Sequence, residues 1–388
     1  MDNKVYAVRC QDYSQTEEKL RELLELMGGM ERFVKSGENI LLKPNLLLAA
    51  VPEKAVTTHP TLVAAVGNMT KSLGASPLIA DSPGSGYPHS VKRLNRLYEK
   101  CGMDKAATEG NIRINYDTTW KAVSFPAGKL IKRIEVITPV LEAEGMINLC
   151  KLKTHTFMGM TGAVKNIFGI IPGLKKPGYH AKLHDTGCFA DMLLDLAAYA
   201  VPRLSIMDAV LAMEGNGPGG GEPRQVGLLL ASANPLALDV IAGEIIGLPR
   251  DNNPILLAAE KRGLRPTRPE KIELIGMDLR ELRIPDFKLP TTFSQGSGFA
   301  LLPAWVTKPI EALCRTGTSL KPRVLKDKCT ACGACRDSCP VHVIEIIAEK
   351  YAQINHKNCI RCYCCHEMCQ DNAIELRSSL LHRLINRK

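Results

Sequence analysis

The stretch GMINLCKLKTHTFMGMTGAVKN (residues 145–166) joins a nearly continuous apolar run to a segment of Lys, His, Thr and Gly. The apolar part, GMINLCKL, has the length and composition of a strand in a sheet that is covered on both faces. Comparable runs alternate with amphipathic helical patterns from the N-terminus to about residue 280. This alternation predicts an α/β fold with a large, mainly parallel sheet. The other predicted strands are KVYAVRC, NILLKPNLL, SPLIADSP, NIRINYD, RLSIMDAV, QVGLLLAS and KIELIGM.

The second part of this stretch concentrates positive charge: it contains Lys151, Lys153, His155 and Lys165 but no carboxylate. It follows a predicted strand, and α/β proteins usually bind ligands in the loops at the carboxyl ends of strands. Histidine carries protons near neutral pH, and a buried lysine has a lowered pKa. We therefore expect a pocket for a carboxylate, a phosphate or an enolate-like intermediate, with Lys153, His155 and Lys165 as catalytic candidates. The alternative is that the lysines are solvated and His155 is an ordinary core histidine.

A second segment at a strand end, EGNGPGGG (residues 214–221), is rich in glycine. Backbone N–H groups in such a loop suit a phosphate, so Gly217, Gly219 and Gly220 are predicted cofactor-binding residues. The spacing matches neither a dinucleotide fingerprint nor a P-loop, and a mobile loop covering the pocket is the alternative. The candidate carboxylate partners for the cations are Asp81, Asp208 and Glu214.

The composition is that of an ordinary globular protein: 388 residues, of which 45% are hydrophobic and 23% charged. The formal net charge is +10, but aromatic residues make up only 5% and basic residues are spread along the chain. We therefore expect no nucleic-acid binding, and anionic small molecules or acidic protein partners account better for the charge. The sequence has no signal-peptide core and no apolar run of membrane-spanning length. A cytoplasmic location without a membrane span is therefore expected.

Most of the 14 cysteines lie between residues 329 and 369. The segments CTACGACRDSCP (329–340) and CIRCYCCHEMCQ (359–370) both have the spacing C-x2-C-x2-C-x3-C. Used twice, this is the spacing of bacterial ferredoxins with two 4Fe-4S clusters. Structural zinc is the alternative, but it would leave half of these cysteines unexplained. By the ferredoxin pattern, one cluster is held by Cys329, Cys332, Cys335 and Cys369, and the other by Cys339, Cys359, Cys362 and Cys365.

The cysteine pattern also predicts the domain organisation. A small ferredoxin-like α+β domain is expected at residues 323–377, and its folding depends largely on metal ligation. The α/β domain is expected at residues 1–280 and a basic tail at residues 378–388. Residues 281–322 contain five prolines and show weak periodicity, which indicates a linker. Cys364 breaks the spacing and is expected to be a small buried side chain.

Several stretches resemble a widespread prokaryotic family known as domain of unknown function 362, whose members often carry a ferredoxin tail. Membership implies little about the reaction, because the family is mostly uncharacterised. The matching stretches are LLKPNLL, TTHPTLVAAV, IADSPG, INLCKLKTHTFMGMTGAVKNIFGIIPGLKK, MDAVLAMEGNGPGGG and ANPLALDVI, in this order between residues 40 and 245.

THTFMGMTGAVKNIFGIIPG, followed by His180, is also similar to a segment of the nickel-pincer lactate racemases. In that family the lysine carries the pincer nucleotide and the later histidine ligates nickel, and the matching positions here are His155, Lys165 and His180. This resemblance adds His180 to the catalytic candidates. Residues 162–164 are Gly-Ala-Val where that family has Gly-Gly-Arg, and its Gly-Thr-His-Arg stretch has no counterpart. We therefore expect a shared pocket rather than shared chemistry.

These features together predict an iron–sulfur redox enzyme of the reductase type. A redox partner protein would supply electrons, and the clusters would pass them to an anionic small molecule in the α/β domain. One alternative is a non-catalytic electron carrier or assembly partner, and another is a racemase-like enzyme with a nickel-type cofactor. No flavin, nicotinamide or molybdenum motif is recognisable, so a second cofactor in the α/β domain is left open.

Overall fold

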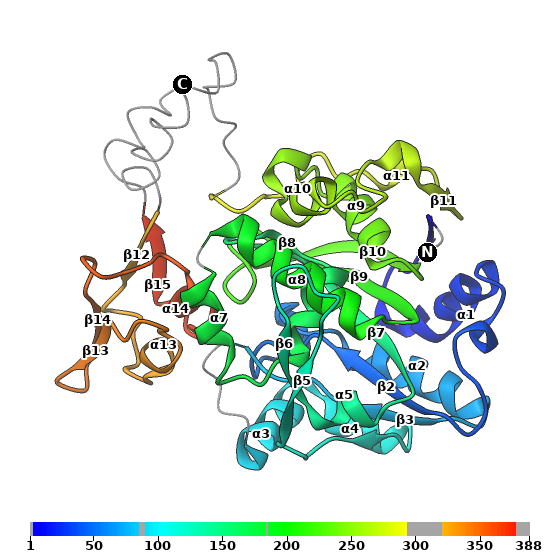
Figure 1. Cartoon of the computed structure of the whole chain (residues 1–388), viewed down its shortest axis with the longest axis horizontal. Coiled ribbons are helices and arrows are strands. Elements are labelled where there is room, and N and C mark those ends of the chain that lie inside the picture. Colours follow the sequence, from blue (N-terminus) through cyan, green and yellow to red (C-terminus); the bar gives the residue numbers. More distant parts are fainter. Residues whose placement is uncertain (1–2, 85–89, 184, 293–319, 378–388) are drawn as a thin grey trace.

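The computed structural model describes residues 3–84, 90–183, 185–292 and 320–377. Figure 1 shows a large α/β body with a small domain of short strands and helices at one end. Most of the predicted linker (residues 281–322) and the whole predicted tail (residues 378–388) lie outside the described residues. The domain limits themselves therefore stay predictions.

The large body is organised around one sheet, with the strand order β11-β1-β10-β9-β7-β2-β3-β4 and β8 paired to β7. Along this order only β10 is antiparallel to its neighbours, so the predicted α/β fold with a mainly parallel sheet is confirmed. The strands are β1 (Lys4–Arg9), β2 (Asn39–Pro44), β3 (Ser76–Ile79), β4 (Arg113–Ile114), β7 (Gly145–His155), β8 (Gly159–Thr161), β9 (Leu204–Glu214), β10 (Glu222–Ser232) and β11 (Glu273–Ile275).

Helices cover both faces of this sheet, because each strand sends alternate side chains to opposite sides. In β1, Tyr6 and Val8 pack on the side of α1 to α4, whereas Val5 and Ala7 pack on the side of α9. The helices are α1 (Thr16–Leu26), α2 (Pro60–Ser72), α3 (Val91–Cys101), α4 (Met103–Glu109), α5 (Thr138–Glu142), α6 (Ala163–Asn166), α7 (Lys176–Lys182), α8 (Thr186–Ala200), α9 (Pro235–Ile245), α10 (Pro254–Lys261) and α11 (Leu279–Leu282).

All eight predicted strands are present, although the run NIRINYD is extended over two residues only. The sequence pattern missed the antiparallel hairpin of β5 (Trp120–Ser124) and β6 (Arg133–Ile137) and the short strand β8. β5 is mostly exposed, so it lacks the apolar run on which the other predictions rest.

The small domain contains two antiparallel strand pairs and two short helices, as predicted for a ferredoxin-like α+β unit. The strand pairs are β12 (Lys321–Val324) with β15 (Ile374–Arg377) and β13 (Ile344–Ile347) with β14 (Tyr351–Ile354). Helix α13 (Ala334–Asp337) lies in the first cysteine motif and α14 (Cys364–Glu367) in the second. No helix within the described ranges has both the length and the apolar character needed to cross a membrane.

Candidate functional site

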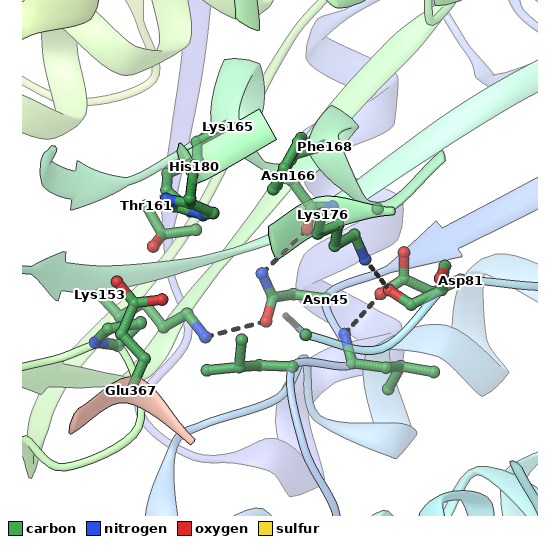
Figure 2. Close-up of a pocket in the computed structure, with 16 residues that line it drawn as sticks. Asn45, Asp81, Lys153, Thr161, Lys165, Asn166, Phe168, Lys176, His180 and Glu367 are labelled. Atoms are coloured by element: carbon green, nitrogen blue, oxygen red, sulfur yellow. Dashed lines mark hydrogen bonds between the residues drawn. The ribbon is translucent and has the colours of Figure 1, made fainter. Parts of the chain in front are cut away.

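A cavity opens where the carboxyl ends of β2, β3 and β7 meet α6, α7 and the small domain (Figure 2). It leaves about 480 Å³ free of protein atoms, including its open mouth. Its charged lining consists of three lysines and two carboxylates: Lys153, Lys165 and Lys176 with Asp81 and Glu367. The cavity thus lies at the edge of the sheet where parallel α/β folds usually bind ligands.

Within the described part of the chain, Lys165 differs from the other two lysines of the cavity in having no hydrogen-bonding or ion-pair partner. Its ammonium lies 5.9 Å from the ring centroid of Phe168 and makes no hydrogen bond or ion pair with a described residue. Burial lowers the pKa of Lys165, and the nearby Glu367 and Cys364 oppose this effect. Lys165 is therefore placed to bind an anionic group from a ligand.

The other two lysines already have partners. Lys153 Nζ donates to Asn45 Oδ1 at 2.9 Å and to the Val56 carbonyl oxygen at 2.7 Å. Lys176 Nζ donates to the carbonyl oxygens of Ser82, at 2.6 Å, and Pro83.

Burial shifts the pKa values of both lysines downward. The pKa of Lys153 lies well below its usual value because of burial and of the neighbouring lysines. Burial lowers the pKa of Lys176 to about 7. Sequence reasoning missed Lys176. The adjacent Lys175 has the same local sequence but lies 4.5 Å from the centroid of the Trp120 ring, so the sequence alone does not distinguish the two lysines.

His155 is fully buried and does not line the cavity. Its Nδ1 accepts hydrogen bonds from the backbone N–H groups of Phe157 (3.1 Å) and Met158 (3.3 Å), so a neutral ring carries its proton on Nε2. This Nε2 lies 3.4 Å from Glu367 Oε1. Burial and the surrounding cations hold the pKa of His155 well below its usual value. The geometry suits orientation of Glu367, and the proton-shuttle role stays a prediction.

His180, from α7, lines the cavity next to Lys165. Its ring stacks on Phe189 with a centroid distance of 4.5 Å, and Phe157 and Phe168 lie at 5.9 Å. Its Nδ1 is buried without a hydrogen-bond partner among the described residues. Burial and the nearby lysines lower its pKa to about 3, so the ring is neutral at physiological pH. A role of His180 as a nickel ligand stays a prediction.

Glu367 is a second site residue that sequence reasoning missed. It ends α14, between Cys365 and Cys369 of the second cysteine motif, and its side chain reaches into the cavity of the other domain. Burial raises its pKa to about 7, although Lys165 and Lys153 act in the opposite direction. A carboxylate between two cysteines of a ferredoxin motif carries no sequence signal of a contact with a distant domain.

The glycine-rich segment 214–221 packs against both the α/β domain and α14. The Gly217 carbonyl accepts a hydrogen bond from Thr156 N, and its N–H lies 3.3 Å from Thr154 Oγ1. A methyl group on Gly219 would clash with the carbonyl of Glu367, and one on Gly220 would approach Asn372. The predicted phosphate-binding role of Gly217, Gly219 and Gly220 stays a prediction, and of this segment Pro218 lines the cavity.

The three candidate carboxylates are each paired with a lysine other than Lys153 and Lys165. Asp208 accepts a hydrogen bond from Lys151 Nζ at 2.7 Å, so the charge of Lys151 is balanced inside the protein. Asp81 accepts from Lys43 Nζ at 2.8 Å and from the N–H of Leu46. Glu214 contacts Lys288 at the surface rather than the cavity.

The predicted cluster ligands lie in the small domain, and their assignment to two clusters stays a prediction. A cavity of the small domain is lined by Cys329, Cys332, Cys335 and Cys369, which combines three thiols of the first motif with the last thiol of the second. Cys339 correspondingly lies near Cys359 and Cys365, and Cys362 lies near these two. Among the described residues, no three His, Cys, Asp or Glu side chains converge as they would on a single metal ion.

The backbone repeats along with the cysteines. Residues 331, 333 and 342 have positive φ angles in the first motif, and residues 361, 363 and 372 have them at the equivalent places of the second. Backbone N–H groups also point at thiols, with Ala352 N on Cys329 Sγ at 3.4 Å and Ala373 N on Cys369 Sγ at 3.1 Å. Such N–H···S bonds stabilise thiolates that hold iron–sulfur clusters, so the residues fit this cofactor.

A family model described as a 4Fe-4S binding domain matches residues 322–345, which supports at least one iron–sulfur cluster and a role in electron transfer. The thylakoid-associated protein sll1697 of Synechocystis sp. is 36% identical over 278 residues, which cover 70% of this chain and 82% of that protein. Since that protein is thylakoid-associated, the cytoplasmic location of this chain stays a prediction.

The lactate racemase apoprotein from Thermoanaerobacterium thermosaccharolyticum is a distant structural match. The TM-score is 0.37 and the identity 13%, and the match covers 63% of this chain and 57% of that one, less than two thirds of the racemase. A family model described as a domain of unknown function (DUF362) matches residues 40–244, and the chain belongs to this family.

Proposed function

We propose that this protein is an iron–sulfur oxidoreductase that binds a small anionic molecule in the cavity between its two domains. Cys329, Cys332, Cys335 and Cys369 would hold one 4Fe-4S cluster, and Cys339, Cys359, Cys362 and Cys365 a second. When bound, such clusters take up and release single electrons.

One observation carries this proposal: Glu367 stands between two predicted cluster ligands and lines the same cavity as the free ammonium of Lys165. A pure electron carrier needs no cationic cavity next to its cysteine motif. A ligand bound at Lys165 would be separated from the second motif only by the Glu367 side chain. A short separation between a cluster and a ligand favours electron transfer. The geometry therefore supports an enzyme more than a carrier.

The residues of the cavity have separate tasks in this proposal. Lys165 binds the anionic group, whereas the Nζ groups of Lys153 and Lys176 donate to protein oxygens and fix the shape of the cavity. Phe168 and α14 exclude water from the bound molecule. His155 does not touch the ligand and holds the Glu367 carboxylate in place from behind.

Lys165→Ala should weaken the binding of inorganic phosphate, used as a probe anion, roughly tenfold or more, because a charged hydrogen bond is lost. Anaerobic calorimetric titration of the iron-loaded protein measures this affinity. Lys175→Ala is the matched control, since this neighbouring lysine lies on Trp120 outside the cavity.

Metal analysis of the same preparations tests the rest of the proposal, and about eight irons per chain without nickel are expected for two clusters. Absence of phosphate binding would favour the carrier, and one nickel per chain would favour the racemase-like alternative. A large loss of thermal stability in Lys165→Ala would show that Lys165 has a structural role instead.

A further inference from the structure

The cavity contains one group that a simple anion site does not need: a carboxylate facing the free lysine. Figure 2 shows the Glu367 carboxylate turned toward the end of the cavity where Thr161, Lys165 and His180 lie. A negatively charged ligand placed against Lys165 therefore meets a second negative group. This arrangement restricts the kind of anion that fits.

Three of the residues that line the cavity have a buried polar atom without a partner among the described residues. Ser82 Oγ, Thr161 Oγ1 and His180 Nδ1 make no hydrogen bond with a described residue. Buried polar atoms of native proteins are almost always satisfied, so such a group points to a water or a ligand. All three residues line the cavity, which indicates that its occupant offers several hydrogen-bonding atoms.

The cations of the cavity provide for one anionic group only. The ammonium groups of Lys153 and Lys176 each donate to two protein oxygens, which leaves Lys165 for the ligand. A multiply charged ligand without donors would gain a single ammonium contact and would be repelled by Glu367.

Glu367 can only accept hydrogen bonds as a carboxylate. Its Oε1 lies 3.4 Å from His155 Nε2 and makes no hydrogen bond with a described residue. An O–H or N–H group of the ligand would satisfy that oxygen and remove the repulsion. His155 is fully buried, and its Nε2 makes no hydrogen bond with a described residue either.

We propose that the ligand is a small oxyanion that carries its own hydrogen-bond donor beside its charge, with Lys165 binding the anionic oxygens and Glu367 accepting the donor. This inference rests on the proposed function and adds the class of ligand. It excludes anions without an O–H or N–H group.

Hydrogenphosphate and sulfate test this inference, because the two dianions have nearly the same size and only hydrogenphosphate keeps an O–H at pH 8. The iron-loaded protein should bind hydrogenphosphate about 10- to 100-fold more tightly than sulfate, since only phosphate satisfies Glu367. Anaerobic calorimetric titration measures both affinities.

Glu367→Gln removes the charge and offers an amide donor, so the phosphate-to-sulfate ratio should fall to within about threefold, mostly through tighter sulfate binding. The matched control is Asp337→Asn, which makes the same charge change at the equivalent position of the first motif. Asp337 is exposed, and its variant should keep the full ratio.

Equal affinities for the two anions in the unmodified protein, both reduced in Lys165→Ala, would overturn the ligand class and leave the proposed function standing. Absence of binding for both anions would overturn the proposed function as well. If Glu367→Gln loses iron, the inference is tested instead by the phosphate-to-sulfate affinity ratio of the unmodified protein and by how both affinities change in Lys165→Ala.

Discussion

The two cysteine motifs share their spacing and their positive-φ positions, but their surroundings differ. In the first motif Cys332 is exposed, and so are Arg336 and Asp337 of α13. In the second motif Glu367 and Met368, which occupy the positions of Asp337 and Ser338, are buried against the α/β domain. The repeat thus conserves the wrapping of the cysteines, whereas the residues between them set what each motif touches.

This difference gives the two motifs separate tasks under the proposed function. Under this proposal, a redox partner protein would approach the exposed first motif. The second motif meets the cavity through Glu367, the glycine-rich segment through His366, and an apolar cluster of the large domain through Met368. Electrons would therefore enter at the first motif and leave at the second.

Cysteine replacements should give the largest effects and separate the two motifs. Cys335→Ala and Cys365→Ala should each lose about four irons, because each removes one ligand of one cluster. Only Cys365→Ala should also lose phosphate binding, since the turn of α14 that holds Glu367 depends on this motif. Iron analysis and calorimetric titration measure the two effects.

Circular dichroism provides the control for both variants, and it should show an α/β domain that is still folded. Intact iron content in both variants would contradict the ligand assignment. Loss of phosphate binding in Cys335→Ala as well would remove the functional difference between the motifs.

The sequence was sufficient for the sheet and for the presence of an iron–sulfur motif. Buried parallel strands are apolar runs, and cluster ligands have a fixed spacing, so both leave a local pattern. Lys153 and Lys165 were proposed as site residues because they lie in a charged segment at the end of a predicted strand, and His180 because of the resemblance to the racemase segment; all three line the cavity.

Contacts between the domains left no such pattern. Glu367 looks like any polar residue of a ferredoxin motif, and only its place in the folded chain brings it to Lys165. The charge of Lys151 was equally ambiguous, because its partner Asp208 comes from a strand far along the chain. Sequence reasoning also placed His155 in the pocket itself, whereas it lies behind Glu367.

Met368→Ala should have the next largest effect. Its side chain is 3% exposed and packs with Leu48, Val56 and Met213, so the truncation should destabilise the docking of α14 by about 2–5 kcal/mol. The temperature of thermal unfolding and the affinity for phosphate should both fall. Ser338→Ala, at the same position of the first motif, is the control.

The control variant removes one hydrogen bond, from Ser338 Oγ to the Cys335 carbonyl at 3.1 Å, which is worth about 1 kcal/mol. It should leave phosphate binding unchanged. Equal effects of Met368→Ala and Ser338→Ala on phosphate affinity would show that α14 is not held by its apolar contact.

The smallest predicted effect is the contribution of His180, a cavity residue, to the pH dependence of the free energy of unfolding. Burial lowers the pKa of His180 from 6.5 to about 3, so between these values the unfolded chain binds a proton that the folded chain does not. Stability from this group is therefore complete above pH 6.5 and is lost as the pH falls toward 3. Between pH 7 and pH 5 the loss is roughly 2 kcal/mol.

His180→Phe should reduce the pH dependence of the free energy of urea unfolding by this amount. Any fixed packing cost of the larger ring cancels, because the comparison is between two pH values of the same variant. An unchanged pH dependence would mean that His180 takes up its proton in the folded protein, and His180 would then be a cation of the cavity beside Lys165.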